Sequence, residues 1–338
     1  MKKCNYQRSV IYRRNRLLLT SVNKKRCLAS IPQFDIKFIY FKRHIKRLDF
    51  LKLLALTPLS IAAMKLKELE TITHGLTQTE KMPVLFLGHG SPMNAIEENE
   101  FVTGFRNAGK NIPKPTAILV ISAHWETRGT FVTAMNKPRT IHDFGGFPQA
   151  LFDVQYSAPG SPELAIETKN IIKKTTVGLD NEWGLDHGAW SVVKHLYPKA
   201  DVPVIEMSID YTQNAQYHYD LAKEIASLRK KGVLIIGSGN MVHNLGLVAW
   251  DKLNTDSYGY DWAIEANEKM KAFILNDDHQ ALINFKSQGK AFDLAIPSPE
   301  HYLPLIYSLA LKEKNEKVSF FNDKAVAGSL TMTSIKID

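Results

Sequence analysis

Residues 83–96, PVLFLGHGSPMNAI, contain a short apolar run that ends abruptly in a glycine–histidine–glycine sequence. An apolar run of this length, closed by glycine, is typical of a buried parallel strand whose last side chain emerges at the carboxyl edge of a sheet. Glycine on both sides of His89 removes the Cβ atoms that would crowd a ligand. The stretch therefore predicts a strand that delivers His89 to a binding site, with a simple strand-end turn as the alternative.

Three further apolar runs follow the same pattern. Residues 117–123, 202–209 and 233–239 are rich in β-branched residues, and amphipathic helical patterns separate them. Such runs indicate parallel strands buried on both faces, with helices packed against the sheet. The alternating segment 328–337 is typical of a strand at the edge of a sheet. Because no repeat or linker interrupts residues 82–338, we predict one α/β domain, a three-layer sandwich with a mostly parallel central sheet.

The basic charge of the chain is concentrated in its N-terminal part. The whole chain holds 43 Lys+Arg and 34 Asp+Glu, a net charge of +9. Residues 1–81 hold 18 of these basic side chains and 5 of the acidic ones, which leaves 25 basic and 29 acidic side chains, a net of −4, in residues 82–338. A mildly acidic body argues against nucleic acid as a partner. We therefore expect a basic extension, residues 1–81, ahead of a domain that spans residues 82–338.

The extension supports three interpretations. Its apolar run, residues 51–64, follows basic residues and contains small ones, which is the order of an export leader that resembles a twin-arginine signal without the arginine pair. The extension could also be a basic tail, or translation could begin at Met64. At about 14 residues, and interrupted by Lys52 and Pro58, the run is too short for a stable membrane span. We expect a cytoplasmic protein, with export through residues 46–64 as the alternative.

Both cysteines of the chain, Cys4 and Cys27, lie in the extension. The domain therefore has no disulfide framework, no thiolate nucleophile and no cysteine metal site. A metal ion in the domain would have to be held by histidine and oxygen ligands.

Five of the 11 histidines occupy positions that predict a common site. His89, His124 and His243 each follow an apolar strand run, so their side chains should meet at one carboxyl edge of the sheet. His187 and His301 lie in loop contexts, LDHGAW and SPEHYLP. A histidine cluster without cysteine is typical of a catalytic Fe(II), Zn or Mn site rather than a closed structural zinc site.

The remaining histidines are expected to be of less importance. His142 lies in a loop of glycine and aromatic residues, IHDFGGFP, which could be a substrate wall or a tight turn. The others are surrounded by charged residues or lie on polar helix faces, and we expect them to be solvated: His44, His74, His195, His218 and His279.

Six separated blocks of the domain resemble the 4,5-DOPA extradiol dioxygenase family, a branch of the class III ring-cleaving enzymes of the protocatechuate 4,5-dioxygenase B subunit type. The blocks are GHGSPMNAIEENE, SAHWETRGT, TIHDFGGFPQALFDVQYSAPGSP, LDHGAWSVVKHLYP, SGNMVHNL and PSPEHYLPLIYSLA. They occur in order and cover about residues 82–338, whereas the extension has no counterpart.

The resemblance implies a mononuclear site for non-haem Fe(II), in which Zn sometimes binds instead. His89, His124 and His301 match the metal positions of the family. His243 matches a position described either as a further ligand or as the acid/base histidine of ring opening, and His187 matches a histidine that faces the substrate.

The third ligand is the open question of this resemblance. The wider class uses two histidines and a carboxylate, and this branch has His301 where the carboxylate would lie. Glu300 is adjacent, so either side chain could complete the site.

The function that this resemblance implies is extradiol cleavage of a catechol by O₂ to a ring-opened semialdehyde. The expected partners are a small aromatic diol and O₂, with His243 as the candidate base and His187 as the group that orients the substrate or donates a proton. The substrate wall is expected to include His142, Trp125 and Tyr302. A zinc-dependent hydrolase on the same histidines is the alternative. The sequence specifies neither the particular catechol nor the oligomeric state.

Overall fold

The protein is described by a computed structural model, in which residues 79–253 and 255–338 are placed. The N-terminal extension therefore lies almost entirely outside the described residues, and the predicted boundary at residue 82 stays a prediction. Residue 79 already contacts the domain, because the Thr79 N–H donates to the Lys230 carbonyl at 2.7 Å. No helix among the described residues is long and apolar enough to cross a membrane.

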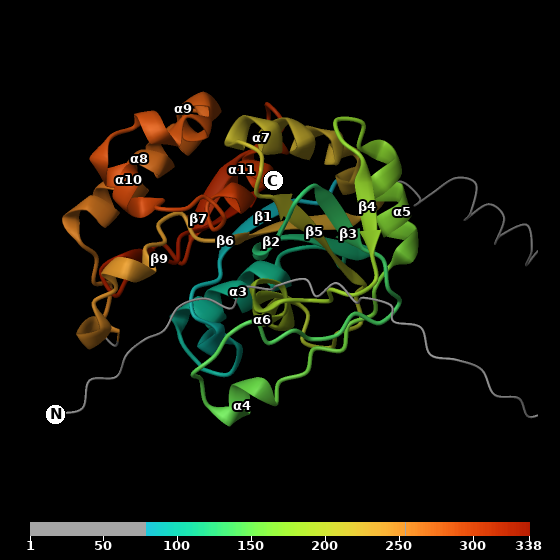
Figure 1. Cartoon of the computed structure of the whole chain (residues 1–338), viewed down its shortest axis with the longest axis horizontal. Coiled ribbons are helices and arrows are strands. Elements are labelled where there is room, and N and C mark those ends of the chain that lie inside the picture. The colour runs from blue at the N-terminus through green and yellow to red at the C-terminus, as the bar shows by residue number, and fades with distance from the viewer. Residues whose placement is uncertain (1–78, 254) are drawn as a thin grey trace, which may run out of the picture. The chain divides into compact units, whose positions relative to one another are not determined.

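A mixed sheet of eight strands forms the centre of the domain (Figure 1). Its order is β4 (Val177–Asp180), β3 (Thr130–Thr133), β5 (Val204–Asp210), β2 (Ala117–Thr127), β6 (Val233–Gly239), β1 (Val84–Gly88), β10 (Ser334–Ile337) and β7 (Val318–Phe321). The central strands β5, β2, β6 and β1 are parallel, β10 is antiparallel to β1, and β7 is antiparallel to β10. This confirms the predicted α/β architecture with a mostly parallel sheet.

Helices cover both faces of this sheet (Figure 1). On one side lie α3 (Glu100–Lys110), α4 (Gln149–Phe152) and α6 (His187–Leu196). On the other lie α5 (Pro162–Ile171), α7 (Ala215–Glu224) and α11 (Leu303–Ala310), with the group α8 (Asp261–Leu275), α9 (His279–Ile283) and α10 (Lys290–Ala295) beside them. A separate two-stranded ribbon joins β8 (Ala325–Val326) and β9 (Leu330–Thr331).

Each face of the sheet has its own hydrophobic core, as the alternation of side chains along a strand requires. In β1, Val84 and Phe86 belong to the core under α7 and α11, whereas Leu85 and Leu87 belong to the core under α3 and α6. Strands β1 and β6 are buried along their whole length, which explains why they read as continuous apolar runs.

The sequence predicts that the C-terminal strand lies at the edge of the sheet, and this prediction is wrong. β10 pairs with β1 on one side and with β7 on the other, so the four-residue strand β7 forms that edge. β7 is only partly buried and has no long apolar run, and for that reason its sequence did not indicate a strand.

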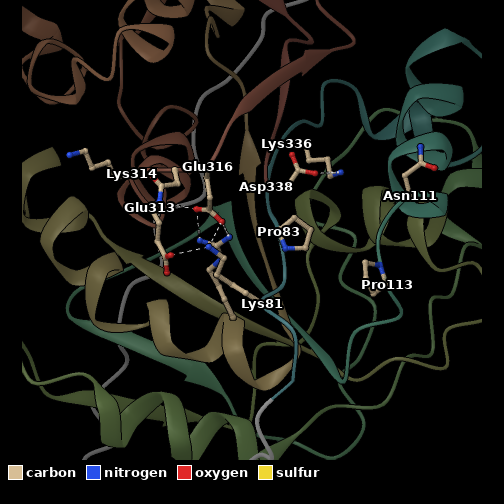
Figure 2. A pocket seen from close by; sticks show the side chains of 11 residues that line it. Lys81, Pro83, Asn111, Pro113, Glu313, Lys314, Glu316, Lys336 and Asp338 are labelled. Carbon is tan, nitrogen blue, oxygen red and sulfur yellow. Dashed lines mark hydrogen bonds and ion pairs between the residues drawn. The ribbon is translucent and has the colours of Figure 1, made fainter.

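A buried ion pair closes the amino edge of the sheet. Arg229 is 1 % exposed, and its guanidinium donates two parallel hydrogen bonds to the carboxylate of Glu316. Lys81 also pairs with Glu316, at 2.9 Å (Figure 2). A cavity of about 590 Å³ lies beside this pair and is lined by charged side chains of both signs. It opens where β1 begins, at the end of the strand opposite to His89.

Candidate metal centre and active site

The five histidines of the predicted site lie together at the carboxyl edge of the sheet. His89 directly follows β1, His243 comes shortly after β6, His187 is the first residue of α6, and His301 precedes α11. His124 does not follow its strand but lies inside β2, where the pairing with β5 shifts in register. Such irregularities redirect side chains and are common beside active sites.

The ring distances show that the five histidines form one cluster. The centroid of His89 is 5.0 Å from that of His124 and 5.3 Å from that of His301. His187 lies 3.9 Å from His124, and His243 stacks on His301 at 3.5 Å with nearly parallel planes. Segments separated by more than two hundred residues thus converge on one point, as the strand-end pattern predicts.

The potential ligand atoms fall into two groups. The imidazole nitrogens of His89, His124 and His187 lie within 4.8 Å of one another, and so do the ligand atoms of His243, Glu300 and His301. The predicted set of His89, His124, His301 and His243 therefore draws two members from each group. Glu300, the alternative third ligand, lies in the second group, so the choice between it and His301 stays a prediction.

The proton of the His89 ring is fixed by a serine. The Ser238 hydroxyl donates to the carbonyl of Gly188 at 2.5 Å, so its oxygen must accept the hydrogen bond of His89 Nδ1, 2.9 Å away. This assigns the proton to Nδ1 and leaves Nε2 with a free lone pair.

Asp143 holds two of the other histidines, and sequence reasoning missed it. Its carboxylate accepts hydrogen bonds from the backbone N–H and from Nδ1 of His187, both at 2.9 Å, and lies 3.4 Å from Nδ1 of His124. Burial alone would raise the pKa of Asp143, but the bonds from His187 lower it below its usual value. Its only signal was its position directly after His142 in the loop predicted to line the site, and nothing local indicates its contacts with His187 and His124.

Glu300 plays the corresponding part for His301. Its Oε1 lies 3.1 Å from Nδ1 of His301 and accepts the hydroxyl of Ser298 at 2.9 Å. Although burial would raise its pKa, the hydrogen bond from His301 lowers the pKa of Glu300 to about 2. The carboxylate is therefore charged at neutral pH and directs Nε2 of His301 away from itself.

The donor set fits a divalent metal ion. Burial, followed by the neighbouring histidines, holds the pKa values of His89 and His124 well below the usual value, and burial lowers that of His243 to about 3. The rings are therefore neutral, as ligation requires. Nε2 of His89 lies 3.2 Å from Nε2 of His124, a separation expected for two nitrogens that each lie about 2.1 Å from one shared ion.

The first turn of α6 connects these histidines with one another. Asp186 caps the helix by accepting the Ala189 N–H, and its Oδ1 also accepts the hydroxyl of Ser122. Gly188 packs so closely that a Cβ atom there would lie 2.4 Å from Oγ of Ser122 and 2.9 Å from the ring of His124. The turn that carries His187 is thereby fixed against β2.

The predicted substrate residues occupy different environments. His142 bonds the carbonyl of Val154 at 3.0 Å, and its ring lies 5.7 Å from that of Phe144, which in turn is 5.5 Å from the ring of His187. Trp125 is buried and stacks on Trp183 at 5.7 Å.

Tyr302 is part of the hydrophobic core. It is 1 % exposed, its ring packs on Phe285, and its hydroxyl donates to the carbonyl of Leu282. Its polar atom is thus already paired inside the core, and we leave it out of the proposed substrate wall.

Two histidines that were expected to be solvated are buried. His195 is 7 % exposed and bonds the carbonyl of Asn94, whereas His218 is fully buried and bonds the hydroxyl of Tyr307. That expectation was wrong for both, because each lies on the face of its helix that packs inward. His279 is half-buried against Tyr219. The other two, His44 and His74, lie outside the described residues.

Comparison with known proteins assigns the chain to one family. The family model described as the catalytic LigB subunit of aromatic ring-opening dioxygenase matches residues 83–315. The chain is 44 % identical over 266 residues to a 4,5-DOPA dioxygenase extradiol of Escherichia coli K12, covering 78 % of this chain and 97 % of the relative. It is 34 % identical over 257 residues to the protein of that name from Beta vulgaris, covering 74 % and 94 %.

A solved structure agrees with these relatives. The crystal structure of an uncharacterized protein from Escherichia coli K12 superimposes with a TM-score of 0.66 at 40 % sequence identity, covering 76 % of this chain and all of that one. The chain therefore belongs to the family of the catalytic LigB subunit of aromatic ring-opening dioxygenases, and it is an enzyme of the extradiol ring-cleaving class.

Proposed function

We propose that this enzyme opens the ring of a catechol with O₂ at a non-haem Fe(II) ion, giving a ring-opened semialdehyde, and that L-DOPA or a similar diol is its substrate. The observation that carries the proposal is the pair of neutral imidazoles, His89 and His124, whose Nε2 atoms face each other at 3.2 Å. The names of the relatives from Escherichia coli and Beta vulgaris support the choice of L-DOPA as the first substrate to test.

In this proposal His89, His124 and His301 hold the ion. Ser238, Asp143 and Glu300 each lie beside Nδ1 of one of these rings and so direct its Nε2 toward the metal. An Fe(II) ion held by these residues would anchor the deprotonated diol and pass electron density from it to O₂. Zn could bind the same nitrogens.

His187 is the better placed of the two candidate catalytic histidines to accept a proton from the catechol. Its Nδ1–H donates to Asp143, which leaves Nε2 as the acceptor and stabilises the imidazolium that forms, in the way an aspartate supports a catalytic histidine in a triad. His243 has no carboxylate bonded to its ring among the described residues, and burial lowers its pKa to about 3, so it is a weak base. We therefore assign proton transfer to His187 and contact with the diol to His243.

The test is anaerobic loading of the full chain with Fe(II), followed by L-DOPA, caffeate or protocatechuate in the presence of O₂. Oxygen uptake and formation of a yellow product are expected, and His89→Ala or His124→Ala should abolish both. His279→Ala, the same substitution away from the cluster, is the matched control and should leave turnover unchanged. No uptake with any catechol, together with ester hydrolysis by the Zn-loaded chain, would favour the hydrolase instead.

A second pair of variants separates ligand from proton acceptor. His301→Ala should weaken metal binding, whereas His187→Ala should keep the metal and lose turnover. Metal content after gel filtration and oxygen uptake are measured on the same samples. Loss of the metal from His187→Ala would show that the group formed by His89, His124 and His187 is the ligand set.

A further inference from the structure

Two carboxyl groups lie completely buried beneath the first turn of α6. Asp186 and Glu206 are both 0 % exposed, the former at the cap of α6 and the latter in the middle of β5. No lysine or arginine among residues 79–253 and 255–338 forms an ion pair with either. An unpaired charge is costly to bury, so two adjacent carboxylates at this depth require either many hydrogen-bond donors or a proton that neutralises one of them.

The donors around the two groups account for three of the four oxygen atoms. The Asp186 N–H donates to Oε1 of Glu206 at 2.8 Å, and the indole of Trp183 donates to Oε2 at 3.3 Å. Oδ1 of Asp186 accepts the hydroxyl of Ser122 at 2.7 Å and the Ala189 N–H at 3.1 Å. Oδ2 of Asp186 is buried and has no partner among these donors.

The two carboxyl groups are neighbours, since the Asp186 N–H bonds Glu206, yet Oδ2 of Asp186 has no partner. Two ionised carboxylates have no hydrogen to donate and would repel each other at this depth, so we expect the pair to carry one proton. A proton on Glu206 would supply the partner that Oδ2 of Asp186 lacks.

We propose that Glu206 is a neutral carboxylic acid that donates a hydrogen bond to the ionised Asp186, and that this pair is the positioning unit for His187 and His124. Asp186 is the ionised member because it lies at the N-terminus of α6 and accepts both the Ser122 hydroxyl and a helix N–H. Burial, and then the negative charge of Asp186, raise the pKa of Glu206 well above its usual value.

The pair is connected to His124 through Ser122 and to His187 through one peptide bond. The Ser122 hydroxyl that Asp186 holds accepts the backbone N–H of His124 at 3.3 Å, and His187 follows Asp186 directly in the chain. The other groups that act on the pair are Asp143, whose charge disfavours a second negative charge here, and the ring of His187. The functional part of this inference rests on the proposed roles of the two histidines.

Two variants of Glu206 distinguish a hydrogen-bond donor from a space-filling side chain. Glu206→Gln keeps the shape, an acceptor oxygen and a donor for Asp186, whereas Glu206→Met keeps the volume and loses every hydrogen bond. We expect turnover of Glu206→Gln to stay within about 3-fold of the unsubstituted chain, and kcat of Glu206→Met to fall by more than about 30-fold with little change in KM, as for other residues that orient ligands.

An infrared measurement tests the proton itself without any metal or substrate. The full metal-free chain at pH 7 should show the C=O stretch of a protonated carboxylic acid, and Glu206→Gln should lack this band. A wild-type spectrum without the band, or an equal kcat for both variants when both melt cooperatively, would overturn the proposal. Because the infrared band does not depend on catechol turnover, a chain that shows the band but cleaves no catechol would refute only the proposed function.

Discussion

The side chains that lie beside the Nδ1 atoms of the histidines are as important to this site as the histidines themselves. Asp143 is the most informative example, because one carboxylate touches His187 and His124 at the same time. Its side chain is 16 % exposed, so its charge is only partly screened by water. Losing that charge should misdirect two rings at once.

We predict that Asp143→Asn weakens binding of a divalent metal to the metal-free chain by about 10- to 100-fold, the usual cost of losing an outer partner of a metal ligand. Calorimetric titration with Zn(II) measures the affinity directly. Asp153→Asn is the matched control, since Asp153 directly follows α4, is exposed, and its carboxylate bonds only Gln149. Equal affinities for the two variants would contradict the role given to Asp143.

The cluster of histidines could be predicted from the sequence, whereas their partners could not. Three of the rings lie in or after strands of one parallel sheet, and this topology alone brings them to one edge. Ser238, Ser122 and Asp143 act through contacts across elements that are distant in the chain, and no local pattern encodes such contacts. His218 was misjudged for the same reason, because its helix face looked polar until α11 was packed against it.

At the scale of elements, α6 is the part on which the site depends most. Its first turn carries His187, its cap reaches β2 through Ser122, and its Gly188 carbonyl reaches His89 through Ser238. A ten-residue helix thus fixes the relative positions of three strands and their side chains at one end.

We predict that Gly188→Ala reduces turnover at least about 100-fold and costs about 1–3 kcal/mol of stability, because the new methyl group overlaps Ser122 and His124. Oxygen uptake and urea unfolding measure the two effects. Gly145→Ala is the control: it lies in the loop beside Asp143, and a Cβ atom there meets nothing within 4 Å. A Gly188→Ala enzyme as active as this control would show that the turn tolerates displacement.

Element prediction failed mainly for short strands. The four-residue strands β3, β4 and β7 lack an apolar run long enough to be recognised in the sequence. Their extended conformation depends on pairing with neighbouring strands from elsewhere in the chain. The long central strands were recognised because burial on both faces requires continuous apolar sequence.

At the scale of the whole molecule, the carboxyl end of the sheet carries the candidate site, and the amino end carries an ion pair that stabilises the fold. The carboxyl edge holds neutral histidines, and the amino edge holds the buried pair of Arg229 and Glu316. Burial alone would raise the pKa of Glu316, but its bond to Arg229 lowers it to about 2, below the usual 4.5. The pair therefore stabilises the fold fully above about pH 4.5 and loses this contribution as the pH falls toward 2.

We predict that Glu316→Ala lowers the free energy of unfolding by about 3–5 kcal/mol at pH 7, because it leaves a buried guanidinium without a counter-charge. The difference from the unsubstituted chain should shrink as the pH is lowered from 4.5 toward 2. Urea unfolding over that range measures both. The double variant Arg229→Met with Glu316→Leu should recover most of the loss at pH 7, and a double variant as unstable as the single one would contradict this explanation.

The order of the strands along the chain also determines when the histidine cluster can form during synthesis. The histidine segments enter the polypeptide over the interval from residue 89 to residue 301, and β1, which carries the first of them, is flanked by β10 at residues 334–337. During synthesis on the ribosome, His89 is therefore made long before His301 and before β10, the strand that pairs with β1. In the proposed ligand set, a fragment that ends before residue 301 lacks one ligand, so the complete metal site would form only late in synthesis.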